Sequence, residues 1–170
     1  MKKLILLTGL LTIMIHAFAG KPQNNSTPDS TDLTGLWTLV TVENINPDGS
    51  KTLPYGISPK GLLVFDKSGN YAIQILKASR PKVEAGDKNK ATPEENAALV
   101  KGNNSHFGTY KINKDEKTIT FYVENAFYPN WEGTVQERFY TLSNNELKYI
   151  VRNTTNGGDI TAVVIWKKMI

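Results

Sequence analysis

Few residues in this chain could do acid–base or nucleophilic chemistry. It has no cysteine and two histidines, His16 and His106, and His16 lies in an apolar N-terminal segment. A zinc-type site needs several His or Cys ligands. A Ser-His-Asp triad would have to use His106, and the adjacent Ser105 would point to the opposite face of a strand. The sequence also lacks a Gly-x-Ser-x-Gly motif or a phosphate-binding glycine loop. It therefore predicts no metal site, no cofactor and no histidine-based hydrolase.

A more promising polar set lies on two consecutive predicted strands. Gln136 and Arg138 are two residues apart and must share a face, and Tyr122 and Glu124 share a face of the preceding strand. If both faces point inward, Arg138 would orient an anionic or carbonyl-bearing ligand, with Tyr122 and Gln136 forming hydrogen bonds to it. Because a buried arginine needs a partner, Glu124 is its natural counter-ion.

The opposite orientation remains open for the first of these strands. Ile119, Phe121 and Val123 alternate with the polar residues, and the usual inside-apolar pattern favours turning these three inward and leaving Tyr122 and Glu124 in water. Along 133–142 the alternation is poor, so a mixed interior is plausible there.

Short alternating or apolar runs with turn residues between them occupy the chain from Leu33 onward. The predicted strands are Gly35–Ile45, Lys60–Asp66, Asn70–Lys77, Ser105–Asn113, Lys117–Asn125, Gly133–Leu142, Glu146–Asn153 and Ile160–Lys168. Short links require antiparallel neighbours, because a parallel return needs a long crossover. Such a meander either packs as a sandwich or closes as a barrel.

One segment departs from this pattern. Thr92-Pro93-Glu94-Glu95 has the parts of a helix capping box, with proline at the first helical position. The predicted helix is short and ends at Gly102, and an irregular loop over 77–91 precedes it. A loop and helix between two strands are well placed to cover one mouth of a barrel.

The N-terminal residues indicate export. Lys2 and Lys3 precede an apolar run, and Ala17-Phe18-Ala19 supplies the small residues of a cleavage site, so residues 1–19 are predicted to be a signal peptide. The run is too short to span a bilayer comfortably, since a spanning helix needs about 20 residues. Residues 20–32 are polar and are predicted to form a flexible leader. Residues 33–170 are predicted to form one domain. No basic cluster interleaved with aromatics is present, which argues against nucleic-acid binding.

An ordered set of motifs resembles the bacterial lipocalin-like domain family over nearly the whole mature chain. The set comprises Gly35-Leu36-Trp37, the run from Pro59 to Ile75, Arg80-Pro81, Glu94-Glu95, Phe107-Gly108-Thr109-Tyr110, Thr118 to Glu124, Pro129 to Arg138, and Ile165-Trp166-Lys167. Two departures are Phe121-Tyr122, where family members typically carry histidines, and Trp166-Lys167-Lys168, where they commonly end in Trp-Glu-Arg. Lysine is a weaker partner than arginine for stacking on a barrel tryptophan.

The resemblance implies a closed antiparallel β-barrel with an interior cavity, here of about eight strands with one short helix. The function favoured is binding of a small, partly apolar molecule in that cavity. The alternatives are a cyclase- or isomerase-type enzyme using Tyr122, Glu124 and Arg138, and a filled barrel that serves as an interaction module. The candidate ligand-binding residues are Tyr71, Arg80, His106, Tyr110, Tyr122, Glu124, Trp131, Gln136 and Arg138.

We predict that the exported protein begins at Gly20, because Ala17 and Ala19 present small residues at both positions that a signal peptidase reads. N-terminal sequencing of protein recovered outside the cytoplasm tests this. Recovery of the chain in a membrane fraction with Met1 retained would contradict it.

Overall fold

The computed structural model describes residues 33–152, 154–155 and 159–170. The predicted signal peptide and leader lie outside these residues. The described strands are β1 (Gly35–Ile45), β2 (Lys51–Thr52), β3 (Lys60–Phe65), β4 (Asn70–Leu76), β5 (Asn103–Asn113), β6 (Thr118–Ala126), β7 (Val135–Ser143), β8 (Glu146–Val151) and β9 (Thr161–Lys168). They are joined by a 3-10 turn η1 (Lys88–Lys90), helix α1 (Pro93–Lys101) and a second 3-10 turn η2 (Pro129–Trp131).

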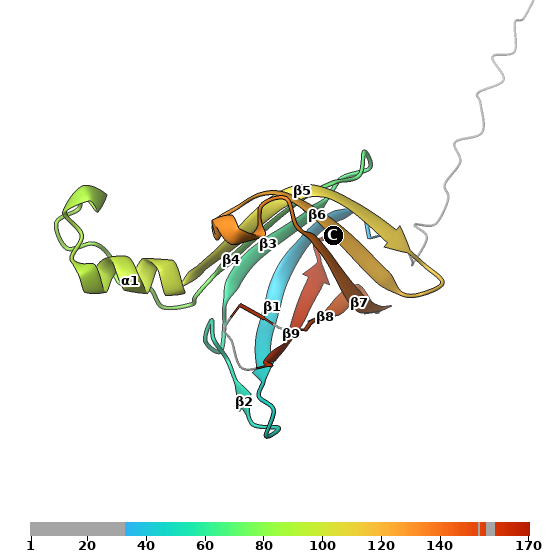
Figure 1. The fold of residues 1–170 in the computed structure, drawn as a ribbon, viewed down its shortest axis with the longest axis horizontal. Coiled ribbons are helices and arrows are strands. Elements are labelled where there is room, and N and C mark those ends of the chain that lie inside the picture. Colours follow the sequence, from blue (N-terminus) through green and yellow to red (C-terminus); the bar gives the residue numbers. More distant parts are fainter. Residues whose placement is uncertain (1–32, 153, 156–158) are drawn as a thin grey trace, which may run out of the picture.

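Pairing of the first long strand with the last closes the sheet into an eight-stranded antiparallel barrel (Figure 1). Each strand from β3 to β8 pairs with the next, and β1 pairs with both β3 and β9. The β1–β9 register runs from Trp37 opposite Lys168 to Ile45 opposite Thr161, with one irregularity between Leu39 and Thr41. Closure is confirmed and the sandwich alternative is wrong.

The eight predicted strands all form, with ends that differ by up to two residues. Strand β5 begins at Asn103, two residues before the predicted start, and this difference brings Asn104 into the barrel wall. Strand β2 was not predicted. It has only two residues, which pair with Asn44 and Ile45 at the end of β1, and so short a segment carries no alternation to detect.

Inward-facing apolar side chains fill the end of the barrel at which β1 begins. Trp37 and Trp166 are fully buried, and Trp37 Nε1 donates a hydrogen bond to the carbonyl of Leu33 at 2.8 Å. The ammonium of Lys168 lies 5.3 Å from the Trp37 ring centroid, so the lysine does stack on a barrel tryptophan. The remaining core includes Leu39, Leu63, Phe65, Tyr71, Ile119, Phe121, Tyr140, Leu147 and Tyr149.

Helix α1 has the predicted capping box, but it does not cover the barrel. The Thr92 side chain accepts from the Glu95 amide and the Glu95 carboxylate accepts from the Thr92 amide. The helix buries no residue and stands away from the barrel beyond the ends of β4 and β5 (Figure 1). The lid prediction is therefore wrong: the excursion is an insertion in the β4–β5 hairpin, closed at its base where the Lys77 amide donates to the Gly102 carbonyl at 2.9 Å.

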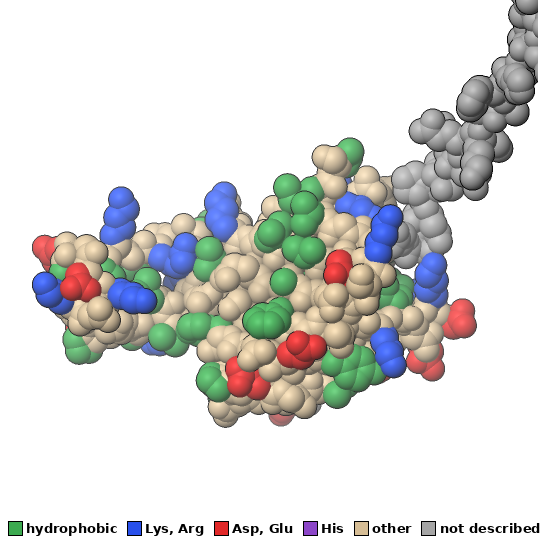
Figure 2. All heavy atoms as spheres, turned by 90° about the horizontal axis from the view of Figure 1, so that it is seen from above, with side chains coloured by type: hydrophobic (Ala, Val, Ile, Leu, Met, Phe, Trp, Pro, Cys, Tyr) green, Lys and Arg blue, Asp and Glu red, His purple; other side chains and the backbone are tan. Residues whose placement is uncertain are grey.

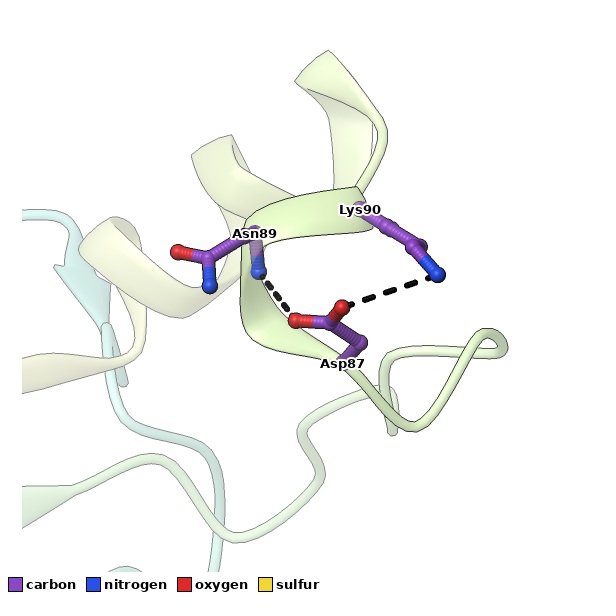
Figure 3. Close-up of polar contacts among 3 residues, drawn as sticks. All are labelled: Asp87, Asn89 and Lys90. Atoms are coloured by element: carbon purple, nitrogen blue, oxygen red, sulfur yellow. Dashed lines mark hydrogen bonds and ion pairs between the residues drawn. The ribbon is translucent and has the colours of Figure 1, made fainter.

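Polar contacts of its own hold this excursion together. The Asp87 carboxylate accepts from the Asn89 amide at 3.0 Å and lies 3.7 Å from the Lys90 ammonium (Figure 3). Charged side chains of both signs gather on the projecting segment (Figure 2), which explains how it stays in water. Among the described residues no helix has the length and apolar character needed to cross a membrane.

We predict that Gly108→Ala destabilises the barrel strongly. A Cβ at Gly108 would collide with the carbonyl oxygen of Tyr122 and lie 2.8 Å from the amide nitrogen of Glu124, where β5 and β6 shift register. Such overpacking should cost about 3 kcal/mol or more of unfolding free energy. Gly133→Ala is the control, because its Cβ meets no atom within 4 Å and its positive φ should cost only roughly 1 kcal/mol. Chemical denaturation measures both, and equal losses would contradict the steric account.

Candidate ligand-binding site

The interior of the barrel holds a buried guanidinium. Because side chains alternate along β7, Gln136 and Arg138 both face inward, and Arg138 is only 6 % exposed. Its Nη2 donates to Gln136 Oε1 at 2.8 Å and lies 3.4 Å from His106 Nε2. The guanidinium carbon lies 4.4 Å from the Phe121 ring centroid and 4.9 Å from that of Tyr149, so two aromatic rings stabilise the charge.

No carboxylate neutralises this charge within the described residues. The ion pairs there are Glu43–Lys51 and Asp87–Lys90, both on the surface. The predicted Arg138–Glu124 pair is wrong: Glu124 is exposed, at the register shift of β6 against β5. Tyr122 faces outward too, under the Lys111 ammonium at 5.6 Å. The orientation with the apolar residues of β6 inward is the one that forms.

His106 is buried against Arg138 and stays neutral. Burial disfavours the imidazolium and the Arg138 charge opposes it further, which together lower the pKa of His106 from 6.5 to about 3. Its Nδ1 lies 2.7 Å from the Tyr71 hydroxyl, whose pKa is raised chiefly by burial. Because a guanidinium only donates, we infer that Nε2 accepts from Arg138 and Nδ1–H donates to Tyr71.

His106 and Arg138 border a cavity of about 470 Å³, which also extends to the outward-facing Val135 and Phe139 of β7. Val42, Ile73, Ile75, Ala162 and Val164 supply apolar wall, and His106, Gln136, Arg138 and Tyr149 supply its polar and aromatic part. Near the end where β1 finishes and β5 begins, the lining is Asn44, Pro54, Tyr55, Asn104 and Trp131. The excursion with α1 contributes no residue to this lining. The arrangement can take a molecule whose body is apolar and whose polar group accepts hydrogen bonds.

Five of the nine predicted site residues come together: Tyr71, His106, Trp131, Gln136 and Arg138. Trp131 packs edge-on against His106 with ring centroids 5.7 Å apart. The other four lie elsewhere: Arg80 is exposed near the helix insertion, Tyr110 donates to the Asp66 carbonyl at 2.8 Å, and Tyr122 and Glu124 face outward.

Asn44, Asn104, Phe121 and Tyr149 are among the residues of the site that were not predicted. The alternation of β1 carries a signal for Asn44, because it lies two residues after the inward-facing Val42. Asn104 lies two residues before His106, outside the predicted strand. The stacking of Phe121 and Tyr149 on Arg138 depends on the register in which β7 pairs with its neighbours β6 and β8, which alternation along a single strand does not fix.

Comparison of the sequence with models of known protein families identifies the family of this barrel. The lipocalin-like domain family matches residues 34–169. The chain belongs to the lipocalin-like domain family. A search of curated proteins finds no match to it. Membership agrees with the closed barrel and supports ligand binding at the level of the family.

In this lipocalin-like barrel, we predict that His106 makes stability pH-dependent. The unfolded chain takes up a proton on this histidine below about pH 6.5, and the folded chain does not until about pH 3. Stability is therefore fully present above pH 6.5 and falls as the pH decreases through this window, by up to about 1.4 kcal/mol per pH unit.

Urea denaturation between about pH 7 and pH 4.5 measures this slope, above the range in which exposed carboxylates titrate. His106→Gln should flatten the slope, whatever its effect on stability at pH 7. An unchanged slope in this variant would show that His106 takes up its proton at the same pH in the folded and the unfolded chain.

Proposed function

We propose that this lipocalin-like barrel binds a small, partly apolar molecule, with an acceptor group of that molecule held at Arg138. One observation carries the proposal: a buried guanidinium borders an interior cavity and meets no carboxylate among the described residues. Burying an unpaired charge costs several kcal/mol. A ligand that brings acceptor oxygens to Arg138 offsets this cost.

The size and walls of the cavity support the same conclusion. Its volume of about 470 Å³ lies within the range of small-molecule sites, which is about 300–1,000 Å³. Apolar side chains on β1, β4 and β9 provide the surface against which an apolar body would be buried. Each Å² of apolar ligand surface buried there contributes about 25 cal/mol, and the polar end supplies orientation.

The two alternatives fare less well. The enzyme built on Tyr122, Glu124 and Arg138 is not supported, because these three side chains do not share the interior. A filled barrel fits less well with a pocket of about 470 Å³ that inward-facing side chains such as Ile73, Ile75 and Val164 help to line.

The proposed setting is outside the cytoplasm. Its support is the signal-peptide pattern of residues 1–19. A carrier there would meet ligands that never enter the cell, which fits binding without a defined reaction.

We predict that protein purified from its native compartment releases a small molecule on denaturation, detected by mass spectrometry, and that Arg138→Met loses it. The substitution should weaken binding by roughly 2–5 kcal/mol, since it removes one partner of a buried polar contact. Thermal stability should stay similar or rise, because an unneutralised buried charge is removed.

Arg80→Met is the matched control, because it removes an exposed arginine that is not part of the cavity lining. Trp131 lines the cavity, so its fluorescence offers a second readout of occupancy. Retention of the same molecule by Arg138→Met, or a collapse of its melting temperature without any effect on binding, would refute the assignment.

A further inference from the structure

Two asparagine amides line the same cavity as Arg138 and have unpartnered oxygens. Asn44 on β1 is 5 % exposed, and its Oδ1 has no hydrogen-bond partner among the described residues. Asn104 on β5 is half-buried, and its Oδ1 likewise has none. The burial of Tyr55 raises its pKa, and its contact with Asn104 opposes that rise, so the Asn104 amide is held beside a protonated phenol. Unpaired amide oxygens are costly in an interior.

The Arg138 guanidinium has N–H donors that make no hydrogen bond. Its hydrogen bonds within the described residues all use Nη2, and its Nε is buried without a partner. A carboxylate is the group that matches the forked donors of arginine. The cavity therefore lacks an acceptor at Arg138 and a donor at the two asparagines.

The strand register fixes the order of these groups along the barrel. Asn104 lies opposite Ile75, and His106, which contacts Arg138, lies opposite Ile73. Two residues along a strand span about 7 Å. Asn104 thus lies about one layer nearer to the end of the barrel bordered by Tyr55 and Trp131 than His106 does.

We propose that the ligand is a carboxylic acid with a single negative charge that also carries a hydroxyl or N–H donor about 7 Å from its carboxylate. This inference rests on the proposed binding function and specifies its ligand. The carboxylate binds Arg138, and the donor binds Asn44 or Asn104. The apolar remainder lies against Ile73, Ile75 and Val164.

The charge of the ligand follows from the charges around the cavity. His106 is neutral and offers no second cation. Arg152 borders the cavity, but its guanidinium lies 5.4 Å from the ring centroid of Phe139, a side chain on the outward face of β7. A second acidic group on the ligand would have no cation to neutralise it inside the barrel.

Three matched probes test the inference by calorimetry on the protein freed of bound molecules. They are lauric acid hydroxylated at about its sixth carbon, which an extended chain places about 7 Å from the carboxylate, plain lauric acid, and the methyl ester of the hydroxylated acid. We expect the hydroxy acid to bind tightest. The ester should bind about thirtyfold more weakly or worse, and plain lauric acid about fivefold more weakly.

Variants assign each preference to its residue. Arg138→Met should abolish the preference for acid over ester, and Asn44→Leu combined with Asn104→Leu should abolish that for the hydroxylated acid. Arg80→Met and Asn96→Leu, both outside the cavity lining, are the controls. The wild-type comparison needs no variant to fold.

The outcomes separate the two levels of the proposal. Equal binding of acid and ester would overturn the carboxylate assignment and leave ligand binding in place. Equal binding of the two acids would overturn the donor assignment. Binding of none of the three, together with no co-purifying molecule, would overturn the proposed function itself.

Discussion

Pairing between β1 and β9 is the constraint on which the rest of this structure depends. It satisfies the backbone groups of both terminal strands and leaves no open edge in the main sheet. Closure also divides the side chains of every strand into an outer and an inner set. Only because the sheet closes does Arg138 come to lie in an interior with His106 and Tyr71.

The barrel interior changes from apolar at one end to partly polar at the other. Large aromatic and aliphatic side chains fill the end near Trp37 and Trp166, and the cavity with its polar groups lies toward the other end. The Arg138 guanidinium, the one buried cation without a carboxylate partner in the described part of the chain, lies between these regions and is stacked on Phe121 and Tyr149. The Arg138 guanidinium has two effects at this position. It would attract an acceptor group of a ligand, and together with burial it keeps His106 neutral. Polar and apolar side chains therefore line the same cavity.

Local sequence patterns predicted most of the fold. Prediction of the site was less complete, because the site depends on contacts between strands. Alternation located the long strands, and the Thr92–Glu95 capping box located the helix, because both signals are contained within a few residues. The same period placed Arg138 inside. Glu124 was misplaced as its partner because the inward face of β6 is chosen by apolar residues. The projection of α1 also could not be foreseen, since capping fixes a helix but not its direction.

The ends of the barrel domain lie side by side. Trp37, near the start of β1, faces Lys168 at the end of β9, and the Met169 amide donates to the Leu36 carbonyl at 2.8 Å. A short peptide could join these ends, and the chain could then be opened in the solvent-facing excursion between β4 and β5, which buries none of α1. Such a circularly permuted barrel would keep every strand pairing and the cavity. The order of strands in the gene is therefore separable from the order of strands around the barrel.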